Sequence, residues 1–386
     1  MIVSHITLKN WRNFQSVDVD MGNRVFLVGP NASGKSNFLD VFRFMRDITK
    51  QGGGLQKAIS DRGGIPKIRC LAARRESDVE IDVSLAETAT EETLWRYAIG
   101  IKQEVRGYRN PYLVYERVWE GDQQMLNRPD HADEKDRLRL TQTHLEQISL
   151  NQPFRDISKF FDSVQYLHLV PQLVRYPSAF PGPGIPGDPY GQNFLERVAR
   201  TRQNTRQARL RKIEGALRVA VPQLKHLIDI KDKSGIPHLE ATYEHWRPKG
   251  AKQREDQFSD GTLRLIGLLW ALLEGDSLLL LEEPELSLNA GIVSKLPALM
   301  HRLQQQKRSR QKRQVMLSTH SADLLSDKGI GGEEVLLLLP SAEGTDVKVA
   351  SSIQEIRDLL EGGLSVADAV LSRTVPRDAH QMVLFK

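Results

Sequence analysis

The segment from Gly29 to Ser36 constrains the fold of this chain more than any other part of the sequence. It reads Gly-Pro-Asn-Ala-Ser-Gly-Lys-Ser and fits the pattern G-x-x-x-x-G-K-[ST] in full. The apolar run 24–28 precedes it and reads as a strand, and a helix is expected to start near Lys35. One face of this helix is apolar and carries Phe38, Val41, Phe42 and Met45. A strand, a glycine-rich turn and a helix in this order predict an α/β fold with a phosphate-binding loop.

Each residue type in this loop has a chemical task. Glycines let backbone N–H groups point at phosphates, and the start of the following helix presents its positive end to the same anion. Lys35 would neutralise the β- and γ-phosphates of ATP, and the Ser36 hydroxyl would bind Mg²⁺. The residues expected to contact ATP here are Asn31, Ala32, Ser33, Gly34, Lys35, Ser36 and Asn37.

An acidic group follows a second apolar run. Residues 277–281 read Ser-Leu-Leu-Leu-Leu, which is typical of a strand buried on both faces, and the next four residues are Glu-Glu-Pro-Glu. Ligands of open α/β sheets bind at this end of the strands. Glu282 is therefore expected to hold hydrated Mg²⁺ and Glu283 to polarise the attacking water. Taken alone, such acids are also common as solvated strand ends.

Residues 258–262 read Phe-Ser-Asp-Gly-Thr and precede an apolar helix over 263–273. The order of phosphate loop, S-x-G signature, E-E-P-E and a strand ending in His320 resembles the ABC-type ATPases of the SMC and RecF-like kind. The match is to the small bacterial AAA-like and OLD-like ATPases of phage-defence systems, and it covers roughly residues 1–340. The resemblance implies an ABC-type P-loop head, with a mixed sheet, flanking helices, an antiparallel β subdomain and a short inserted helical arm.

In this family, the signature of one subunit caps the γ-phosphate bound by the phosphate loop of another. The resemblance therefore implies a homodimer in which Ser259 and Gly261 contact ATP. It also implies that His320 is the switch histidine, which acts with Glu283 and Lys35 in catalysis. The signature departs from the usual L-S-G-G, and a plain helix N-cap is the alternative role of its serine.

Three further segments match the family less closely. Residues 286–290 lie where the D-loop is expected, but Asn-Ala replaces the usual His-Pro, so the detail of its cross-dimer contact stays open. Residues 9–14 resemble the N-x-R-x-F segment of RecF-like and SMC-like heads, which places Arg12 near the nucleotide. The Q-loop glutamine is Gln51, Gln56 or Gln172, and the sequence offers no reason to choose among them.

The remaining pattern predicts three parts of the chain. Residues 1–175 form the first half of the head, 176–250 a Pro/Gly loop with the helical arm, and 251–386 the second half. The strand-like runs of the first part, which alternate as in an antiparallel sheet, are 2–8, 79–85, 95–101 and 113–119. A further strand is expected over 166–171, an irregular loop over 176–192, and one helix over 194–220.

Charge and composition bear on partners and location. The net charge of +5 and the pI near 9.1 permit a nucleic-acid partner without requiring one. The arginine-rich helix and the basic run 307–313 could follow phosphates, contact an acidic protein or be solvated faces. The single cysteine, Cys70, excludes an intramolecular disulfide framework and a cysteine-cluster metal site. The start of the sequence lacks the pattern of a signal peptide, and its apolar runs are short, so a cytoplasmic protein is expected.

These observations predict an ATP hydrolase that dimerises around ATP and Mg²⁺. The resemblance implies that it gates a separate effector, a nuclease or toxin, in antiphage defence, because the sequence shows no nuclease motif of its own. A RecF-like DNA-repair ATPase is the alternative. A transporter subunit and a scaffold with negligible turnover are weaker fits.

Overall fold

The computed structural model describes residues 1–73, 78–89, 91–107, 109–180, 185, 187–244, 250–306 and 313–374. The chain forms two compact units. The first contains residues 1–164, 276–280 and 307–386, and the second contains residues 165–275 and 281–306. The phosphate loop and His320 therefore belong to the first unit, whereas the signature, the acidic pair and the predicted arm belong to the second.

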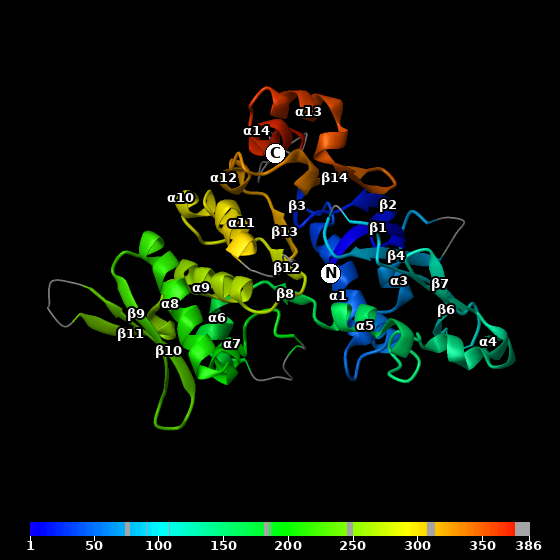
Figure 1. Ribbon diagram of the computed structural model, residues 1–386, viewed down its shortest axis with the longest axis horizontal. Coiled ribbons are helices and arrows are strands. Elements are labelled where there is room, and N and C mark those ends of the chain that lie inside the picture. Colours follow the sequence, from blue (N-terminus) through cyan, green and yellow to red (C-terminus); the bar gives the residue numbers. More distant parts are fainter. Residues whose placement is uncertain are drawn as a thin grey trace, which may run out of the picture. The chain divides into compact units, whose positions relative to one another are not determined.

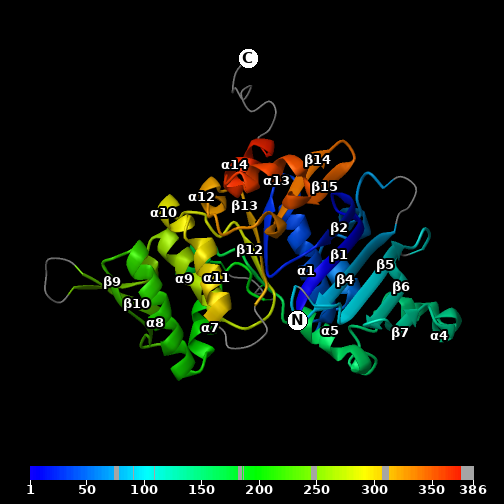
Figure 2. The same ribbon diagram turned by 45° about the horizontal axis from the view of Figure 1, so that its top comes forward.

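The first unit contains a six-stranded antiparallel sheet in the order β2-β1-β4-β5-β6-β7, of which β4 to β7 lie side by side in Figure 2. Its strands are β1 (Ile2–Trp11), β2 (Phe14–Asp20), β4 (Val79–Ala86), β5 (Trp95–Gln103), β6 (Pro111–Glu120) and β7 (Gln123–Arg128). All four strand-like runs predicted for this region are strands of the sheet. Burial alternates over the first half of β4, whereas most of β5 is buried without alternation.

A second sheet of the first unit carries the phosphate loop. Its strands run in the order β15 (Gly344–Val349), β14 (Val335–Ser341), β3 (Arg24–Val28), β13 (Val315–Thr319) and β12 (Leu279–Glu282). Strand β3 pairs in parallel with both β13 and β14. Strands β3 and β13 are buried along their whole length, as expected for parallel strands covered on both faces.

Helix α1 (Lys35–Thr49) follows β3 and packs through the predicted apolar face, which is fully buried. Two aromatic residues near the end of the β1–β2 hairpin hold this helix. The ring centroids of Trp11 and Phe44 lie 5.2 Å apart, and those of Phe14 and Phe38 lie 6.1 Å apart. The N-terminal hairpin is thereby fixed beside the helix that begins at the phosphate loop.

Short helices complete the first unit. They are α2 (Leu55–Ser60), α3 (Ile65–Ile68), α4 (His131–Lys135), α5 (Arg155–Asp162), α12 (Ala322–Leu325), α13 (Gln354–Glu361) and α14 (Val366–Val370). Helix α5 packs on α1, and α13 packs on α14, as Figure 1 shows. Among the helices that the structure describes, none has the length and apolar character to cross a membrane.

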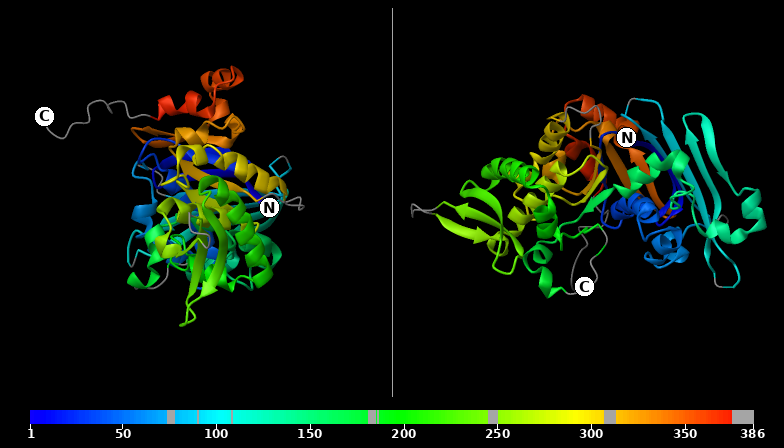
Figure 3. Two further views of the ribbon diagram at one scale, coloured as in Figure 1. Left: turned by 90° about the vertical axis from the view of Figure 1, so that its left-hand side faces the viewer. Right: turned by 60° about the horizontal axis from the view of Figure 1, so that its bottom comes forward.

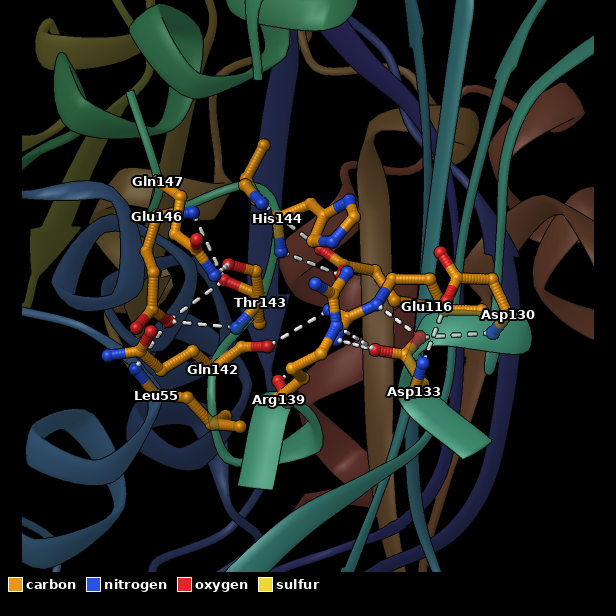
Figure 4. A network of polar contacts seen from close by, with 12 residues as sticks. Leu55, Glu116, Asp130, Asp133, Arg139, Gln142, Thr143, His144, Glu146 and Gln147 are labelled. Atoms are coloured by element: carbon orange, nitrogen blue, oxygen red, sulfur yellow. Dashed lines mark hydrogen bonds and ion pairs between the residues drawn. The ribbon is translucent and has the colours of Figure 1, made fainter. Parts of the chain in front are cut away.

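A buried ionic network stabilises the far end of the antiparallel sheet (Figure 4). The guanidinium of Arg128 donates to both carboxylate oxygens of Asp133 at 2.9 Å and to Glu116 Oε2 at 2.8 Å. All three side chains are 0% exposed. Glu116 also accepts hydrogen bonds from the Tyr97 hydroxyl at 2.9 Å and from the His144 backbone N–H at 2.8 Å. The buried charges are thus paired and hydrogen-bonded, as burial requires.

The second unit combines helices with a small sheet. Its strands are β8 (Gln165–Leu167), which pairs with β12, and β9 (Leu224–Lys231), β10 (Pro237–Tyr243) and β11 (Ala251–Arg254), which form an antiparallel sheet visible in Figure 3. Its helices are α6 (Pro171–Arg175), α7 (Phe194–Arg200), α8 (Gln203–Ala220), α9 (Asp260–Leu273), α10 (Ala290–Val293) and α11 (Leu296–Gln306). Helix α8 packs on β9.

The predicted strand over 166–171 is wrong in its second half. Strand β8 ends at Leu167, and α6 begins at Pro171, whose fixed φ suits the first turn of a helix. Between them, the backbone N–H groups of His168 and Val170 donate to carbonyl oxygens of the loop at 189–190 instead of to a strand. The segment after β8 does form backbone hydrogen bonds with another part of the chain, but that part is a loop and not a strand.

The predicted single helix over 194–220 is also wrong. It is interrupted between α7 and α8, where Thr201 and Arg202 have extended backbone conformations. The Arg206 guanidinium donates from Nη1 to the carbonyl oxygens of Ala199 at 2.7 Å and Thr201 at 2.9 Å. These bonds satisfy carbonyl groups that a continuous helix would have used, so a side chain stabilises the break.

Candidate nucleotide-binding site

The phosphate loop connects the end of β3 to the start of α1, as the sequence predicted. Two residues in it have left-handed backbone conformations, Ala32 with φ of 62° and Gly34 with φ of 95°. A methyl group at Gly34 would lie 2.2 Å from Asn13 Nδ2. Glycine is therefore required here both by the backbone conformation and by the close approach of a neighbouring side chain.

The loop wraps around the lysine side chain. Lys35 Nζ donates to the carbonyl oxygens of Gly29 at 2.8 Å and Pro30 at 3.0 Å, and the residue is 7% exposed. The predicted metal ligand Ser36 is exposed at the first turn of α1. Of the other predicted contact residues, Asn31 and Ala32 are exposed, whereas Ser33 is buried. The loop thus offers a cation and a hydroxyl at one helix N-terminus.

Asn13 organises this loop, although the sequence analysis did not assign it a role. Its Nδ2 donates to the Ser33 carbonyl oxygen at 2.8 Å and to Thr345 Oγ1 at 2.9 Å. Its Oδ1 accepts a hydrogen bond from Asn37 Nδ2 at 2.8 Å. Asn37 was predicted to contact ATP, but its amide group is engaged inside the protein. Asn13 lies within the N-x-R-x-F segment, but the resemblance assigned a role only to the arginine of that segment.

Arg12, which was predicted to lie near the nucleotide, pairs with a carboxylate on α1. Its Nη2 and Nε lie 2.6 and 3.1 Å from Asp40 Oδ2. Arg62 donates to both oxygens of the same carboxylate, at 2.9 and 3.0 Å. Burial alone would raise the pKa of Asp40, but the Arg62 and Arg12 guanidinium groups outweigh it and hold this pKa below its usual value. A role for Arg12 at the nucleotide stays a prediction.

His320 follows β13, one strand away from the phosphate loop. Thr319 of β13 lies opposite Val28 of β3 in a parallel pair, so His320 and Gly29 follow neighbouring strands at the same edge of the sheet. The His320 side chain is exposed. This is the edge at which ligands bind in parallel sheets, which suits the predicted contact with a γ-phosphate.

In the second unit, the signature forms the start of α9. Ser259 is the N-cap: its Oγ accepts from the Thr262 backbone N–H at 3.2 Å and lies 2.8 Å from Thr262 Oγ1. The capping role considered from the sequence is therefore confirmed, and it leaves the positive end of a 14-residue helix behind the serine. A methyl group at Gly261 would lie 2.5 Å from the Ser287 carbonyl oxygen, so this glycine allows the predicted D-loop to approach the signature within the unit.

Residues of α6 hold the signature in place. Arg175 Nη2 lies 2.6 Å from Asp260 Oδ1 and donates to the Phe258 carbonyl oxygen at 2.6 Å. Gln172, one of three candidates for the Q-loop glutamine, donates to Asp260 Oδ2 at 3.4 Å. Arg175 was not predicted, because nothing in the sequence relates it to a motif 85 residues away.

The other two Q-loop candidates lie in the first unit. Gln56 Nε2 donates to the carbonyl oxygens of Pro111 and Thr141, at 2.9 and 2.8 Å, and so connects two backbone segments of the antiparallel region. Gln51 is exposed after the end of α1. Of the three glutamines, Gln172 has a hydrogen bond to a residue of the signature.

The acidic pair occupies the end of β12. The Tyr166 hydroxyl donates to Glu282 Oε2, and His168 Nδ1 lies 3.3 Å from the Glu282 carbonyl oxygen. Glu283 has φ of 43°, a left-handed conformation that is uncommon for residues other than glycine. Such conformations cluster at functional sites, where the surrounding structure maintains them. The structure thus gives the Glu282 carboxylate a tyrosine partner and places Glu283 on a left-handed backbone.

A small cavity beside the acidic pair is lined in part by an arginine, Arg264, to which the sequence assigned no role. It is lined by Leu167, Leu169, Arg264, Leu268, Leu281, Glu282, Glu283 and Pro284. Burial lowers the pKa of Arg264, and the charges of Asp260 and Glu283 partly offset this effect. Arg264 lies on the signature helix, so this helix brings a positive charge to the cavity that Glu282 and Glu283 also line.

Several cations of the predicted basic arm have partners inside the protein. Arg206 pairs with Asp229 at 2.8 Å, Arg197 with Glu274 at 3.4 Å, and Arg209 stacks on Trp270 with its guanidinium carbon 5.2 Å from the ring centroid. Among the described residues of the arm, the exposed cations are Arg200, Arg202, Arg211, Lys212, Arg218, Lys231 and Lys233. The basic run 307–313 lies outside the described residues except for Arg313, which is buried and donates to the Ser277 carbonyl oxygen at 2.8 Å.

Comparison with known proteins places these motifs in context. A family described as "AAA domain, putative AbiEii toxin, Type IV TA system" matches residues 24–327. The endonuclease GajA of Bacillus cereus (strain VD045) is 40% identical over 58 residues, which are 15% of this chain and 10% of GajA. The DNA replication and repair protein RecF of Roseiflexus castenholzii (strain DSM 13941 / HLO8) is 28% identical over 118 residues, which are 28% of this chain and 29% of RecF. The chain thus spans less than a third of either protein.

Among solved structures, an SMC head bound to the C-winged helix domain of ScpA has the same fold. It superimposes with a TM-score of 0.53 at 12% identity and covers 90% of this chain and 98% of the SMC head chain. At this identity the likeness concerns the fold alone. It confirms the predicted architecture of mixed sheets with flanking helices.

Proposed function

This chain belongs to the AAA-domain family matched above and is an ATPase of the SMC and RecF-like type, and we propose that two copies enclose and hydrolyse ATP to control a separate effector. The observation that carries the proposal is the phosphate loop. Its glycine-dependent geometry places Lys35 and Ser36 at the start of a 15-residue helix, at the edge of parallel strands where ligands bind.

Each predicted side chain has a role that its chemistry supports. Lys35 would leave the loop carbonyl groups and neutralise phosphate charge, and the exposed His320 would contact the γ-phosphate. Glu283 would orient the attacking water, and its unusual backbone geometry is the kind that functional sites maintain.

The metal that we propose for this ATPase is Mg²⁺, and each predicted ligand, Ser36 in the first unit and Glu282 in the second, has a suitable oxygen. Mg²⁺ prefers oxygen ligands and is held in proteins by one or two carboxylates together with substrate phosphates. The Ser36 hydroxyl and the Glu282 carboxylate are oxygen donors of this kind. When bound, Mg²⁺ would neutralise charge that develops on the phosphates.

The signature supports the enclosure of ATP by a second copy. Ser259 and Gly261 stand at the N-terminus of a 14-residue helix, where the helix dipole favours an anion. We propose that they contact the γ-phosphate held by the phosphate loop of the partner chain. The signature is held by Arg175, which would keep its geometry fixed when the two chains meet.

A separate effector is proposed because of the relatives. The match to GajA, an endonuclease, is limited to a tenth of that protein. We propose that the chain supplies the ATP-dependent step, and that a nuclease or toxin supplied by another polypeptide acts in defence against phage.

A RecF-like role in DNA repair is a second candidate. It is favoured by the match to RecF and by the exposed cations of the arm, which include Arg202, Arg211 and Lys212. The two candidates differ in what stimulates the enzyme. Duplex DNA should raise the ATPase rate of a RecF-like protein, whereas an effector-gating ATPase should respond to its partner protein and not to DNA alone.

Two variants test the proposal. Lys35→Ala should abolish binding of a fluorescent ATP analogue, whereas Lys57→Ala, which changes an exposed lysine of α2, should bind it normally. Glu283→Gln should bind ATP without hydrolysing it, and light scattering should then show twice the chain mass of 43.7 kDa. Glu120→Gln, at an exposed strand end, is the matched control. A mass that stays at one chain in the presence of ATP would contradict the enclosure of ATP by two copies.

A further inference from the structure

Tyr166 of β8 and Glu282 at the end of β12 both belong to the second unit. Strand β8 pairs with β12, and the Tyr166 hydroxyl donates a hydrogen bond to Glu282 Oε2. The tyrosine is 5% exposed, whereas the carboxylate is half-buried. Side chains on one face of adjacent strands lie close enough for such a pair. The hydroxyl is therefore presented to the carboxylate by the sheet itself.

The hydrogen bond restricts the carboxylate in a defined way. An ionised carboxylate has two oxygens and about four lone-pair sites, and the hydroxyl occupies one site on Oε2. Hydrogen bonds to charged groups are stronger than neutral ones, so this contact selects one orientation of the side chain. The backbone of Glu282 is also held, because its carbonyl oxygen lies 3.3 Å from His168 Nδ1.

The histidine in turn has a fixed neighbour. Its ring packs edge-to-face on Tyr190, with 6.2 Å between the ring centroids. Backbone and side chain of Glu282 are thus each anchored by a residue of the segment that contains β8. Outer residues that orient metal ligands in this way commonly change metal affinity 10–100-fold when they are removed.

We propose that Tyr166 is a positioning residue for Mg²⁺, which it serves by holding the Glu282 carboxylate in its binding orientation. The inference rests on the proposed function, in which Glu282 is a metal ligand. A buried tyrosine hydroxyl also needs a partner for reasons of stability alone. The two roles differ in one respect: a purely structural hydroxyl changes stability without changing the Mg²⁺ requirement.

The test compares Mg²⁺ dependence in Tyr166→Phe and in the parent protein. Both carry Glu283→Gln, so that binding of a fluorescent ATP analogue is measured without hydrolysis. The Mg²⁺ concentration at half-saturation should rise about tenfold in Tyr166→Phe, whereas analogue affinity in EDTA should be unchanged. Mn²⁺ binding followed by electron paramagnetic resonance should weaken by a similar factor. Tyr190→Phe, which removes a nearby hydroxyl and keeps the ring on His168, should leave the Mg²⁺ requirement unchanged.

A second variant keeps the test informative if Tyr166→Phe does not fold. Tyr166→Met replaces the ring by a flexible apolar side chain that adapts to its surroundings, and it should raise the Mg²⁺ requirement in the same way. In a Glu282→Gln background, Tyr166→Phe should have no additional effect, because the partner that it orients is absent.

The possible failures are distinguishable. If the parent protein shows no Mg²⁺-dependent binding of the analogue, the proposed function fails and the inference fails with it. If the parent shows it, and folded Tyr166→Phe or Tyr166→Met has the same Mg²⁺ half-saturation and Mn²⁺ affinity, the positioning role alone is wrong.

Discussion

Removal of the buried guanidinium of Arg128 should destabilise the first unit strongly. Arg128 makes five hydrogen bonds, with Asp133, Glu116 and the carbonyl oxygens of Gln142 and Arg139, over 2.8 to 2.9 Å. Arg128→Met keeps much of the side-chain volume but leaves two buried carboxylates, those of Glu116 and Asp133 labelled in Figure 4, without their shared cation. Breaking a buried ion pair from one side costs about 3–5 kcal/mol.

Both carboxylates keep other hydrogen-bond partners in Arg128→Met, so the loss in free energy of unfolding should stay within about 3–5 kcal/mol and not double. Asp133 retains Arg139, whose Nε lies 3.0 Å from Oδ1, and Glu116 retains the Tyr97 hydroxyl and the His144 N–H. The expected loss can be read from urea unfolding. With an m-value of about 3 kcal/mol/M, a loss of about 3–5 kcal/mol lowers the midpoint by about 1–1.7 M.

Two further variants serve as a control and as a test of the uncompensated charge. Arg117→Met removes an exposed guanidinium of the neighbouring strand that lies over Tyr115, and it should cost no more than about 1 kcal/mol. Arg128→Met combined with Glu116→Gln should recover more than about 1 kcal/mol relative to Arg128→Met, because it removes one uncompensated charge. A midpoint of Arg128→Met equal to that of Arg117→Met would refute the reasoning.

The other predictions follow from single contacts. Gly261→Ala should lower kcat at least about tenfold, because the added methyl group would displace the Ser287 carbonyl. The control Gly215→Ala, in the middle of α8 where a methyl group meets no other atom, should leave kcat unchanged and stabilise the protein by about 1 kcal/mol. Asn13→Ala should raise the Kd for ATP about tenfold, which equals the net contribution of one or two of its hydrogen bonds, as measured by titration with a fluorescent analogue. Burial would raise the pKa of Asp133, but hydrogen bonds from Arg128 and Arg139 hold this pKa below its usual value. The contribution of the ionised Asp133 to the free energy of unfolding should therefore be constant from pH 7 to 5 and be lost as the pH falls below ~4. Urea midpoints of the wild type and Asp133→Asn should accordingly converge only in acid.

The parts of the site that are local in sequence were predictable. Strand β3, the loop and α1 form one continuous segment, so the residues that specify the strand, the left-handed Gly34 and the helix that begins at Lys35 are all visible at fixed spacing. The same holds for the signature, where Ser259 caps its own helix. Such features are determined by neighbouring residues in the chain.

The contacts that orient these motifs were not predictable, because they join residues far apart in the chain. Tyr166 and Glu282 are separated by 116 residues, and Arg175 reaches Asp260 across 85. No spacing rule relates such positions, and a single sequence offers no measure of distance. These contacts follow only from the pairing of β8 with β12 and from the packing of α6 beside α9.

Charge density was the least informative pattern. The arginines of 197–218 suggested one basic surface, but Arg206 stabilises a helix break and pairs with Asp229, and Arg209 covers Trp270. A sequence shows that a guanidinium is present but not whether it is solvated. The arm that remains for an external partner is therefore less basic than its composition suggested.

The most direct test of the account asks whether the signature acts on the ATP of a partner chain. Lys35→Ala removes the phosphate-loop cation, and Ser259→Arg blocks the signature, so each variant alone should be inactive. A mixed dimer contains one site with both elements damaged and one with both intact. Equimolar mixing should therefore restore about a quarter of the wild-type ATPase rate, since half of the dimers are mixed and each has one working site. No recovery on mixing, with both variants folded, would contradict the claim that two copies enclose ATP.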